Sequence, residues 1–344
     1  MNIADINAWL HEQNPDALEE LYAMARKTRA RYVGNQVHLR GRVDFSNMCR
    51  RQCTYCGIRA GNRRVVRYLM SSEEIMACAA AVQARGYGTI VLQAGEDERI
   101  SAGWIADLVS TIRETYGLTV ALSLGERPDS DYRLWRAHGA ERYLLKFETS
   151  DTVLYRCIHP PYAKSAGNRL KMLKDLRAMG YEIGSGIMVG LPGQALASLT
   201  DDLLMFQEFD LDMIAVGPYI PHPHTPLARK FSPGKSKAPD QVANSDTMAH
   251  KVVSLVRLLC PEANIPATSA LSCISKQGLR FGLHAGANVI MPDMTPPEYE
   301  ALYDIYPKSR ILPPINMYKN IMEIVASAGL VPGFGPGARQ RNSG

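Results

Sequence analysis

Three cysteines within eight residues carry the clearest chemistry in this sequence. Cys49, Cys53 and Cys56 follow the spacing C-x3-C-x2-C. Three thiolates this close together can bind three irons of one iron–sulfur cube, and they leave the fourth iron without a protein ligand. An iron open to a small molecule is a site for chemistry, whereas a cluster with four protein ligands only carries electrons. The loop therefore predicts a catalytic cluster.

Zinc is the alternative metal for this loop. A structural zinc site takes four protein ligands, commonly as two short pairs. The other cysteines of the chain are Cys78, Cys157, Cys260 and Cys273. None of them forms a second C-x2-C pair, and we interpret them as small buried residues. His222 and His224 flank Pro223, and this pattern is more typical of a turn than of a metal site.

Composition and length narrow the class of protein. The 344 residues are 46% hydrophobic and 21% charged, which suits one large α/β barrel. The net charge of +5 comes without a dense Lys/Arg run, so nucleic acid is not expected as a partner. No apolar stretch is long enough to span a membrane, and the first residues lack a signal peptide's apolar core. The odd number of cysteines, seven, fits the reducing cytoplasm.

Short apolar runs alternate with amphipathic stretches along most of the chain. The predicted strands are Val37–Phe45, Thr89–Gln93, Thr119–Leu124, Arg142–Phe147, Glu182–Val189, Met213–Tyr219, Ile265–Leu271 and Asn288–Met291. The predicted helices are residues 2–31, Ser72–Arg85, Ala102–Tyr116, Tyr132–Ala137, Arg169–Met179, Leu196–Phe209 and Thr247–Leu259. Eight strands that alternate with helices favour a (βα)8 TIM barrel over an open sheet.

The predicted organisation has three parts. Residues 1–35 form an N-terminal helical extension, residues 36–330 form the barrel and its C-terminal helix, and residues 331–344 form a flexible tail. In such a barrel the active site lies at the carboxyl ends of the strands. The cysteine loop directly follows the first strand, so it is expected at the barrel mouth.

The cysteine loop, with Tyr55 just before its last cysteine, resembles that of radical S-adenosylmethionine (SAM) enzymes. Other strings resemble one branch of this superfamily, which contains biotin synthase, methylornithine synthase and the iron–iron hydrogenase maturase HydE, with HydE the nearest. They are Tyr32-Val33-Gly34-Asn35, Gly95-Glu96-Asp97, Ser123-Leu124-Gly125-Glu126, Val189-Gly190-Leu191-Pro192-Gly193-Gln194, Pro221-His222-Pro223 and Ile265-Pro266-Ala267-Thr268. The similarity covers about residues 20–330.

The resemblance implies one 4Fe–4S cluster and SAM as cofactors, and reductive cleavage of SAM to a 5′-deoxyadenosyl radical. It also implies that the Tyr55 backbone contacts adenine, that Glu96 lies near the methionine amino group, and that Arg169 pairs with the carboxylate of SAM. The SAM-contacting residues implied in this way are Tyr55, Gly95, Glu96, Ser123, Glu148, Arg169, Met188 and Gly190.

Several positions depart from the HydE pattern. Some members carry three further cysteines near the C-terminus, but residues 308–322 contain none, so a single cluster is predicted. Ala94, Ala121, Lys146 and Phe147 also differ from the usual residues and are expected to face the substrate. The substrate contacts that the resemblance implies are Gln93, Ala94, Ala121, Lys146, Met213, Thr268, Ser269 and Tyr299.

A HydE-type maturase acting on a small-molecule or organometallic substrate is the preferred functional interpretation. The same scaffold could instead carry an amino-acid mutase, as in methylornithine synthase, or sulfur chemistry as in biotin synthase. A non-catalytic metal-binding scaffold is disfavoured, since it would not need Glu148 and Arg169 at strand ends.

The expected partners are a flavodoxin- or ferredoxin-type electron donor and other hydrogenase maturases. An acidic donor could dock on a group of arginines in the cysteine loop, which are otherwise a solvated basic surface. They are Arg50, Arg51, Arg59, Arg63, Arg64 and Arg67.

Overall fold

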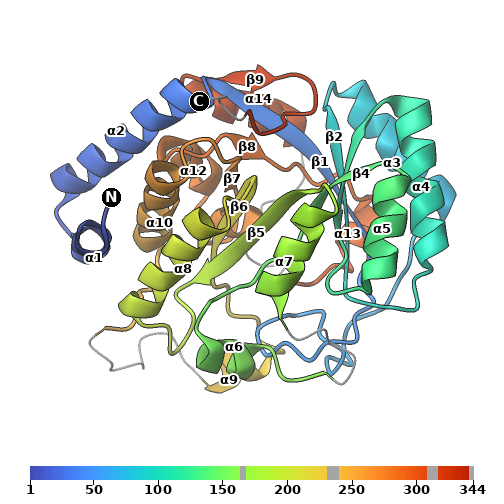
Figure 1. The fold of residues 1–344 in the computed structure, drawn as a ribbon, viewed down its shortest axis with the longest axis horizontal. Helices are drawn as coiled ribbons and strands as arrows, with labels where there is room; N and C mark the ends of the chain where they lie inside the picture. The colour runs from blue at the N-terminus through green and yellow to red at the C-terminus, as the bar shows by residue number, and fades with distance from the viewer. Residues whose placement is uncertain (163–167, 231–239, 308–316, 341–344) are drawn as a thin grey trace.

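Eight parallel strands form the centre of the molecule, and helices cover their outer side (Figure 1). The computed structural model describes residues 1–162, 168–230, 240–307 and 317–340. The strands are β1 Gln36–Ser46, β2 Thr89–Ala94, β3 Thr119–Ser123, β4 Ala140–Leu144, β5 Glu182–Val189, β6 Met213–Pro218, β7 Pro266–Ala267 and β8 Val289–Ile290. Side chains at alternate positions of a strand share one face, so each strand lines the interior with every second residue.

The sheet closes into a barrel. Strands β1 to β6 lie side by side in chain order, β8 pairs with the other edge of β1, and β7 pairs with β8. A parallel bridge between Met213 and Asn264 joins β6 to the segment just before β7. The TIM-barrel prediction is therefore confirmed.

The helices pack around this barrel and include an N-terminal pair. They are α1 Ile3–His11, α2 Pro15–Tyr32, α3 Ser72–Ala84, α4 Ala102–Tyr116, α5 Asp129–Ala137, α6 Thr152–Ile158, α7 Arg169–Ala178, α8 Leu196–Glu208, α9 Pro226–Lys230, α10 Asp246–Leu259, α11 Ser269–Ile274, α12 Gly278–His284, α13 Pro297–Glu300 and α14 Met317–Ser327. Figure 1 shows α1 and α2 at the outer edge of the molecule, beside α8 and α10 and far from α3 to α5. No helix in the described part of the chain has the length and apolarity needed to cross a membrane.

The seventh strand is shorter than predicted. A strand over Ile265–Leu271 is wrong beyond Ala267, because helix α11 begins at Ser269 with Thr268 as its N-cap. Short apolar runs suit a strand or a buried helix equally well. Here the helix buries Ala270 and Leu271 against the barrel, which leaves the strand only two residues long.

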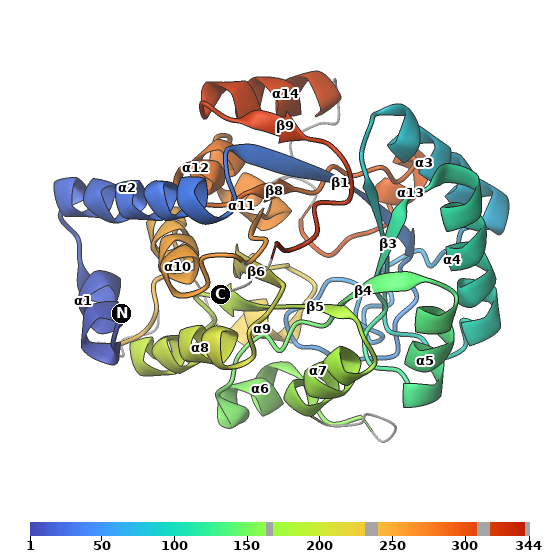
Figure 2. The same cartoon turned by 45° about the horizontal axis from the view of Figure 1, so that its top comes forward.

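The predicted flexible tail is also corrected for the part that the structure describes. Val331–Gly333 form strand β9, which pairs with β1, and Figure 2 shows the chain turning from β9 back toward the barrel strands. The Gly337 carbonyl accepts hydrogen bonds from Arg40 Nη2 at 2.9 Å and from Asn264 Nδ2 at 3.0 Å. This segment therefore closes the amino-terminal end of the barrel, while residues 341–344 lie outside the described residues.

Candidate functional site

The cysteine loop lies at the carboxyl ends of the strands, and its backbone is hydrogen-bonded to three neighbouring elements. The Arg50 amide donates to the Glu96 carbonyl, after β2, at 2.9 Å. The Thr54 amide donates to the Ile158 carbonyl, at the end of α6, at 2.9 Å. The Thr54 carbonyl accepts from the Leu227 amide of α9 at 3.0 Å. The backbone of the loop is therefore positioned by the barrel.

The three thiols lie in surroundings that suit metal binding. Burial raises the pKa of Cys53 to about 12 and also raises the pKa values of Cys49 and Cys56, so these thiols hold their protons until a metal replaces them. Among the described residues, no three His, Cys, Asp or Glu side chains converge on the position of one metal ion. Each cysteine of a cube binds a different iron, so the donors fit a cluster better than a single zinc ion.

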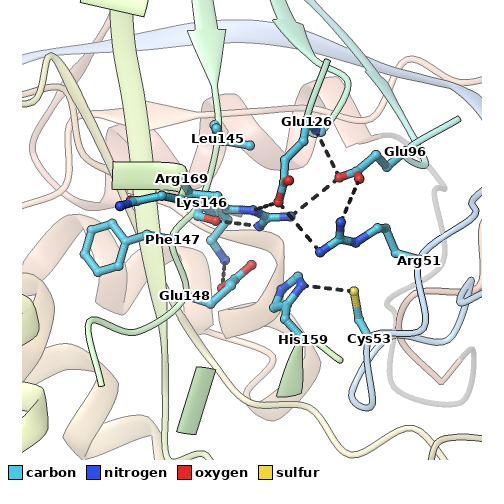
Figure 3. Close-up of polar contacts among 12 residues, drawn as sticks. Arg51, Cys53, Glu96, Glu126, Leu145, Lys146, Phe147, Glu148, His159 and Arg169 are labelled. Atoms are coloured by element: carbon cyan, nitrogen blue, oxygen red, sulfur yellow. Dashed lines mark hydrogen bonds and ion pairs between the residues drawn. The ribbon is translucent and has the colours of Figure 1, made fainter. Parts of the chain in front are cut away.

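Two arginines and two glutamates, all buried except the partly exposed Glu96, form a group beside the loop (Figure 3). We call this group the charged quartet: Arg51, Glu96, Glu126 and Arg169. Arg169 Nε donates to Glu126 Oε1 at 2.9 Å. The other guanidinium–carboxylate distances are longer, at 3.4 Å for Arg51 to Glu96, 3.6 Å for Arg169 to Glu96 and 3.7 Å for Arg51 to Glu126. Residues from the cysteine loop, from the ends of β2 and β3 and from α7 thus meet at one point.

The charged quartet has the chemistry to hold a zwitterion. Burial raises the pKa of Glu96, and the nearby guanidinium groups of Arg169 and Arg51 oppose that rise. The 3.4–3.6 Å separations exceed normal hydrogen-bond lengths, so these guanidinium donors can turn to a bound carboxylate. A ligand ammonium group would in turn be stabilised by Glu96 or Glu126.

Glu148 has a left-handed backbone, with φ of 64°. This conformation costs a residue with a side chain about 1–2 kcal/mol. Backbone hydrogen bonds hold it, since the Glu148 amide donates to Gly186 O at 2.9 Å and the Glu148 carbonyl accepts from the Met188 amide at 3.2 Å. The carboxylate lies 3.2 Å from Lys146 Nζ. Strain of this kind is a marker of functional sites.

His159 is a site residue that sequence reasoning missed. Its Nδ1 lies 3.3 Å from Cys53 Sγ, and its Nε2 lies 2.9 Å from the Tyr55 hydroxyl. The side chain is 4% exposed. Burial, followed by the charges of Arg169 and Arg51, lowers the pKa of His159 well below its usual value, so the ring is neutral. The His159-Pro160 sequence offers no pattern that points to a cysteine 106 residues away.

The predicted SAM contacts differ in their surroundings. Tyr55, Glu96, Glu148 and Arg169 surround the buried Cys53, while Ser123 ends β3 beside β2. The glycines have structural explanations of their own. A Cβ on Gly95 would lie 2.2 Å from the Met48 carbonyl oxygen, and a Cβ on Gly190 would lie 2.5 Å from Asn244 Cα. Met188 is buried in an apolar cluster against which Tyr55 packs.

Some of the predicted substrate contacts lie near an interior group of charges that sequence reasoning missed. Arg42 pairs with Asp293, and its Nε lies 3.2 Å from Asp44 Oδ2. Gln93 Nε2 donates to Asp44 Oδ1 at 2.8 Å, and Arg42 Nη1 donates to Ser269 Oγ at 3.5 Å. Burial and the nearby Asp293 carboxylate raise the pKa of Asp44. The interior wall between β1 and β8 is therefore polar and ion-paired.

The other predicted substrate contacts differ in their surroundings. Ala121 is fully buried on β3, and Ala94 ends β2. Both side chains are small. Thr268 already donates from Oγ1 to the Val216 carbonyl at 3.0 Å. Phe147 is buried against Phe206, outside the strands, so its predicted place facing the substrate is corrected.

Two further predicted substrate contacts have partners within the protein. Met213 is the first residue of β6, and its Sδ accepts from Arg40 Nη1 at 2.9 Å, which places it near the closed end of the barrel. The Tyr299 hydroxyl donates to Glu74 of α3 at 2.6 Å, and its ring packs on Tyr68 with centroids 4.8 Å apart. The structure thus gives both residues packing roles.

The histidine pair and the basic loop are also placed by the structure. His222 Nε2 lies 3.1 Å from Asp304 Oδ2, and its Nδ1 accepts from the His224 amide, as a turn requires. Arg67 is used internally, where it donates to backbone carbonyls including that of Ile58 at 2.7 Å. The buried Arg51 belongs to the charged quartet. Arg63 and Arg64 are exposed and so remain available to an acidic partner.

Comparison with known proteins agrees with this geometry. The family model of the radical SAM superfamily matches residues 43–205. The chain is 42% identical to the [FeFe] hydrogenase maturase subunit HydE of Thermotoga maritima, over 94% of this chain and 89% of that protein. It is 31% identical to 3-methylornithine synthase of Methanosarcina acetivorans, over 87% and 82% of the two chains. The crystal structure of methylornithine synthase superposes with a TM-score of 0.79 at 27% identity, covering 96% of this chain and 94% of the other.

Proposed function

The chain belongs to the radical SAM superfamily, and from this we propose that it is a HydE-type maturase in the assembly of the active-site cluster of iron–iron hydrogenase. The observation that carries the proposal is the 42% identity to a HydE protein over nearly the whole chain. The barrel mouth supports it, because the cysteine loop, the charged quartet and Glu148 meet there.

We assign roles at the mouth residue by residue. Cys49, Cys53 and Cys56 would hold a 4Fe–4S cluster, which when bound would supply the electron for reductive cleavage of SAM. Arg169 and Glu96 bind the carboxylate and ammonium groups of SAM. The buried position of these groups keeps water away from the reactive atoms.

The substrate side of the proposal concerns the barrel interior below the mouth. Gln93, Lys146 and Ser269 supply polar groups, and Ala94 and Ala121 are the small residues that we place next to the substrate. The electron donor is proposed to be an acidic flavodoxin or ferredoxin that meets Arg63 and Arg64. A reducing cytoplasm is the proposed location, since the cluster ligands must stay reduced.

The enzyme class is tested by anaerobic reconstitution with iron and sulfide, reduction and addition of SAM. We expect 5′-deoxyadenosine and methionine from the wild type and none from Cys53→Ala. A well-loaded cluster that yields no 5′-deoxyadenosine would contradict the assignment. The maturase role is tested by replacing HydE with this protein in a defined hydrogenase maturation mixture. We expect hydrogen evolution to appear, and its absence with SAM cleavage intact would remove the HydE-type role alone.

A second candidate is an amino-acid rearrangement on the same scaffold. The interior ion pairs of Arg42 with Asp44 and Asp293 favour it, because charged walls suit a small zwitterion. The relationship to 3-methylornithine synthase is consistent with this chemistry. Free amino acids, lysine first, are added to the SAM-cleavage assay. Faster 5′-deoxyadenosine formation with a new amino-acid product would support the rearrangement over the maturase role.

A further inference from the structure

A chain of four polar side chains leads from the cysteine loop into the barrel mouth. Cys53 Sγ lies 3.3 Å from His159 Nδ1, and His159 Nε2 lies 2.9 Å from the Tyr55 hydroxyl. Tyr55 in turn donates to Glu148 Oε1 at 3.3 Å. Figure 3 shows the imidazole between Cys53 and Glu148. We call these four residues the sulfur–carboxylate chain.

The imidazole is held firmly in this position. His159 follows the last residue of α6, and its amide donates to the Tyr155 carbonyl at 2.7 Å. Its ring stacks on the Tyr155 ring with centroids 4.9 Å apart and an interplanar angle of 11°. Only 4% of the residue is exposed, so bulk water does not compete for its nitrogens. The ring is therefore a fixed hydrogen-bonding group, pointed at a sulfur.

The number of hydrogens on these side chains decides in which direction the hydrogen bonds of the sulfur–carboxylate chain run. A neutral imidazole has one N–H and one acceptor nitrogen, and a tyrosine hydroxyl has one hydrogen. When Cys53 is a thiol, the thiol can donate to Nδ1, the Nε2 hydrogen goes to Tyr55, and Tyr55 donates to Glu148. When Cys53 is a thiolate on iron, its sulfur has no hydrogen and can only accept. A hydrogen bond to that sulfur then requires the hydrogen on Nδ1.

We propose that His159 is a positioning residue for the cluster: its Nδ1–H donates a hydrogen bond to the iron-bound sulfur of Cys53 and makes the cluster easier to reduce. This inference rests on the proposed function, since it takes Cys53 as a cluster ligand. A donor at the sulfur stabilises the extra negative charge of the reduced cluster, and hydrogen bonds to cluster sulfurs are a known determinant of reduction potential.

One consequence reaches Glu148. With the hydrogen on Nδ1, Nε2 becomes an acceptor and takes the Tyr55 hydroxyl hydrogen. Glu148 then loses the hydrogen bond that Tyr55 donates to Oε1. It keeps the contact between Oε2 and the Lys146 ammonium group at 3.2 Å. Loading of the cluster thereby leaves one carboxylate oxygen ready to accept a hydrogen bond from a ligand at the mouth.

The test is the midpoint potential of the reconstituted cluster, measured by a redox titration followed by electron paramagnetic resonance without SAM. Two variants are compared with the wild type. His159→Phe keeps the stacking on Tyr155 and has no donor, so its potential should shift to a more negative value. His159→Asn places an amide N–H near the position of Nδ1, so its potential should stay close to that of the wild type. Iron and sulfide content is measured for each protein.

Equal potentials in the wild type and His159→Phe, with equal cluster content, would overturn the inference. If the variants do not load a cluster, the wild type labelled with 15N-histidine decides, because a donated hydrogen bond gives a magnetic coupling between the reduced cluster and the imidazole nitrogen. Absence of that coupling would also overturn it. Wild-type protein that fails to cleave SAM would count against the proposed function, whatever the potentials are.

Discussion

Both ends of the barrel bury arginine side chains, and the two ends satisfy them differently. At the closed end, Arg40 donates to the Gly337 carbonyl at 2.9 Å, and Arg142 donates to Thr89 Oγ1 at 2.8 Å and pairs with Glu182. At the mouth, Arg51 and Arg169 face Glu96 across 3.4 and 3.6 Å. At the mouth, two arginines and two glutamates oppose one another, and only one of their four contacts, Arg169 to Glu126 at 2.9 Å, is at hydrogen-bond distance.

The difference shows that a buried charge is not by itself a sign of function. The arginines of the closed end donate to short protein contacts, although Arg40 Nε and Arg142 Nη2 have no hydrogen-bond partner among the described residues. Those of the mouth belong to a group with equal numbers of positive and negative charges, in which three of the four guanidinium–carboxylate separations are 3.4–3.7 Å. Such a group costs folding free energy unless a ligand completes it. Substitutions at the mouth should therefore change activity more than stability, and substitutions at the closed end should change stability more than activity.

The largest effect is expected from Cys53→Ala. Loss of one of three cluster ligands should abolish the visible absorbance of the cluster and the formation of 5′-deoxyadenosine. The unfolding midpoint of the metal-free protein should change little, since the substitution removes one small side chain. Absorbance, product analysis and urea denaturation measure these outcomes. Retention of either the absorbance or the product would mean that the ligands are wrongly assigned.

Arg169→Gln should give the next largest loss of activity. The variant lacks the charge that pairs with a ligand carboxylate, so SAM cleavage should slow by roughly 100-fold, as with loss of one positioned charge-stabilising donor. The rate per loaded cluster and SAM binding by equilibrium dialysis are the measurements.

The matched control is Arg40→Gln at the closed end. It should leave the rate per cluster unchanged and lower the unfolding free energy. If the two variants lost activity to the same extent, the contrast between the ends of the barrel would not hold.

Removal of residues 334–344 should destabilise the protein without changing its chemistry. The side chains of Arg40, Asn264 and Thr89 lose the carbonyl acceptors of Gly337 and Pro336. The expected loss is roughly 2 kcal/mol of unfolding free energy, the cost of leaving buried donors without partners. Urea denaturation measures the loss, and the SAM-cleavage rate well below the unfolding midpoint should match that of the full chain. A large fall in that rate would mean that the closed end contributes to the site.

Glu148→Asn should separate strain from function at a single residue. Asparagine tolerates the left-handed backbone better than glutamate, so the unfolding free energy should stay equal or rise by up to about 1 kcal/mol. SAM binding should weaken, because the carboxylate is lost. Calorimetric binding of SAM and denaturation of the metal-free protein test the two effects. A destabilised variant that binds SAM normally would show that the strain has no functional role.

An effect on stability alone, and only through pH, is expected from Asp202, which accepts a hydrogen bond from Ser150 Oγ at 2.7 Å. Burial, only partly opposed by hydrogen bonds from Ser150 and Thr149, raises the pKa of Asp202 to about 7. The folded protein therefore binds an extra proton between about pH 4 and pH 7. This stabilisation is complete below the unfolded pKa of about 3.9 and is lost as the pH rises through 7.

Asp202→Asn should remove that pH dependence. As the pH rises from about 4 to 7, the unfolding free energy of the wild type should fall relative to that of the variant by up to about 1.4 kcal/mol per pH unit. Burial lowers the pKa of His38 to about 4, and this shift makes the unfolding free energy of both proteins rise with pH. The test is therefore the difference between the wild type and Asp202→Asn at each pH. Denaturation of the metal-free protein from pH 4.5 to 7.5 is the measurement, and parallel curves would contradict the expectation.

The sequence by itself determined the barrel and the position of the cysteine loop. Strand β5 matches its predicted bounds, and β1 and β2 agree with theirs within one residue at each end. Their apolar periodicity is a local property, and it can be read without knowing neighbours in space. The spacing of Cys49, Cys53 and Cys56 is local in the same way. Because the loop follows the first strand, its place at the mouth follows from the fold class alone.

Only the tertiary structure decided which side chains meet. His159 lies 106 residues from Cys53, and Arg169 lies 43 residues from Glu126. Arg42 pairs with Asp293, which is 251 residues away. The same limit applies to Met213 and Tyr299, which contact Arg40 and Glu74, and to Val331–Gly333, which pair with β1. Local patterns specify which face of an element is buried, but only the packing of distant elements sets which charge lies opposite another.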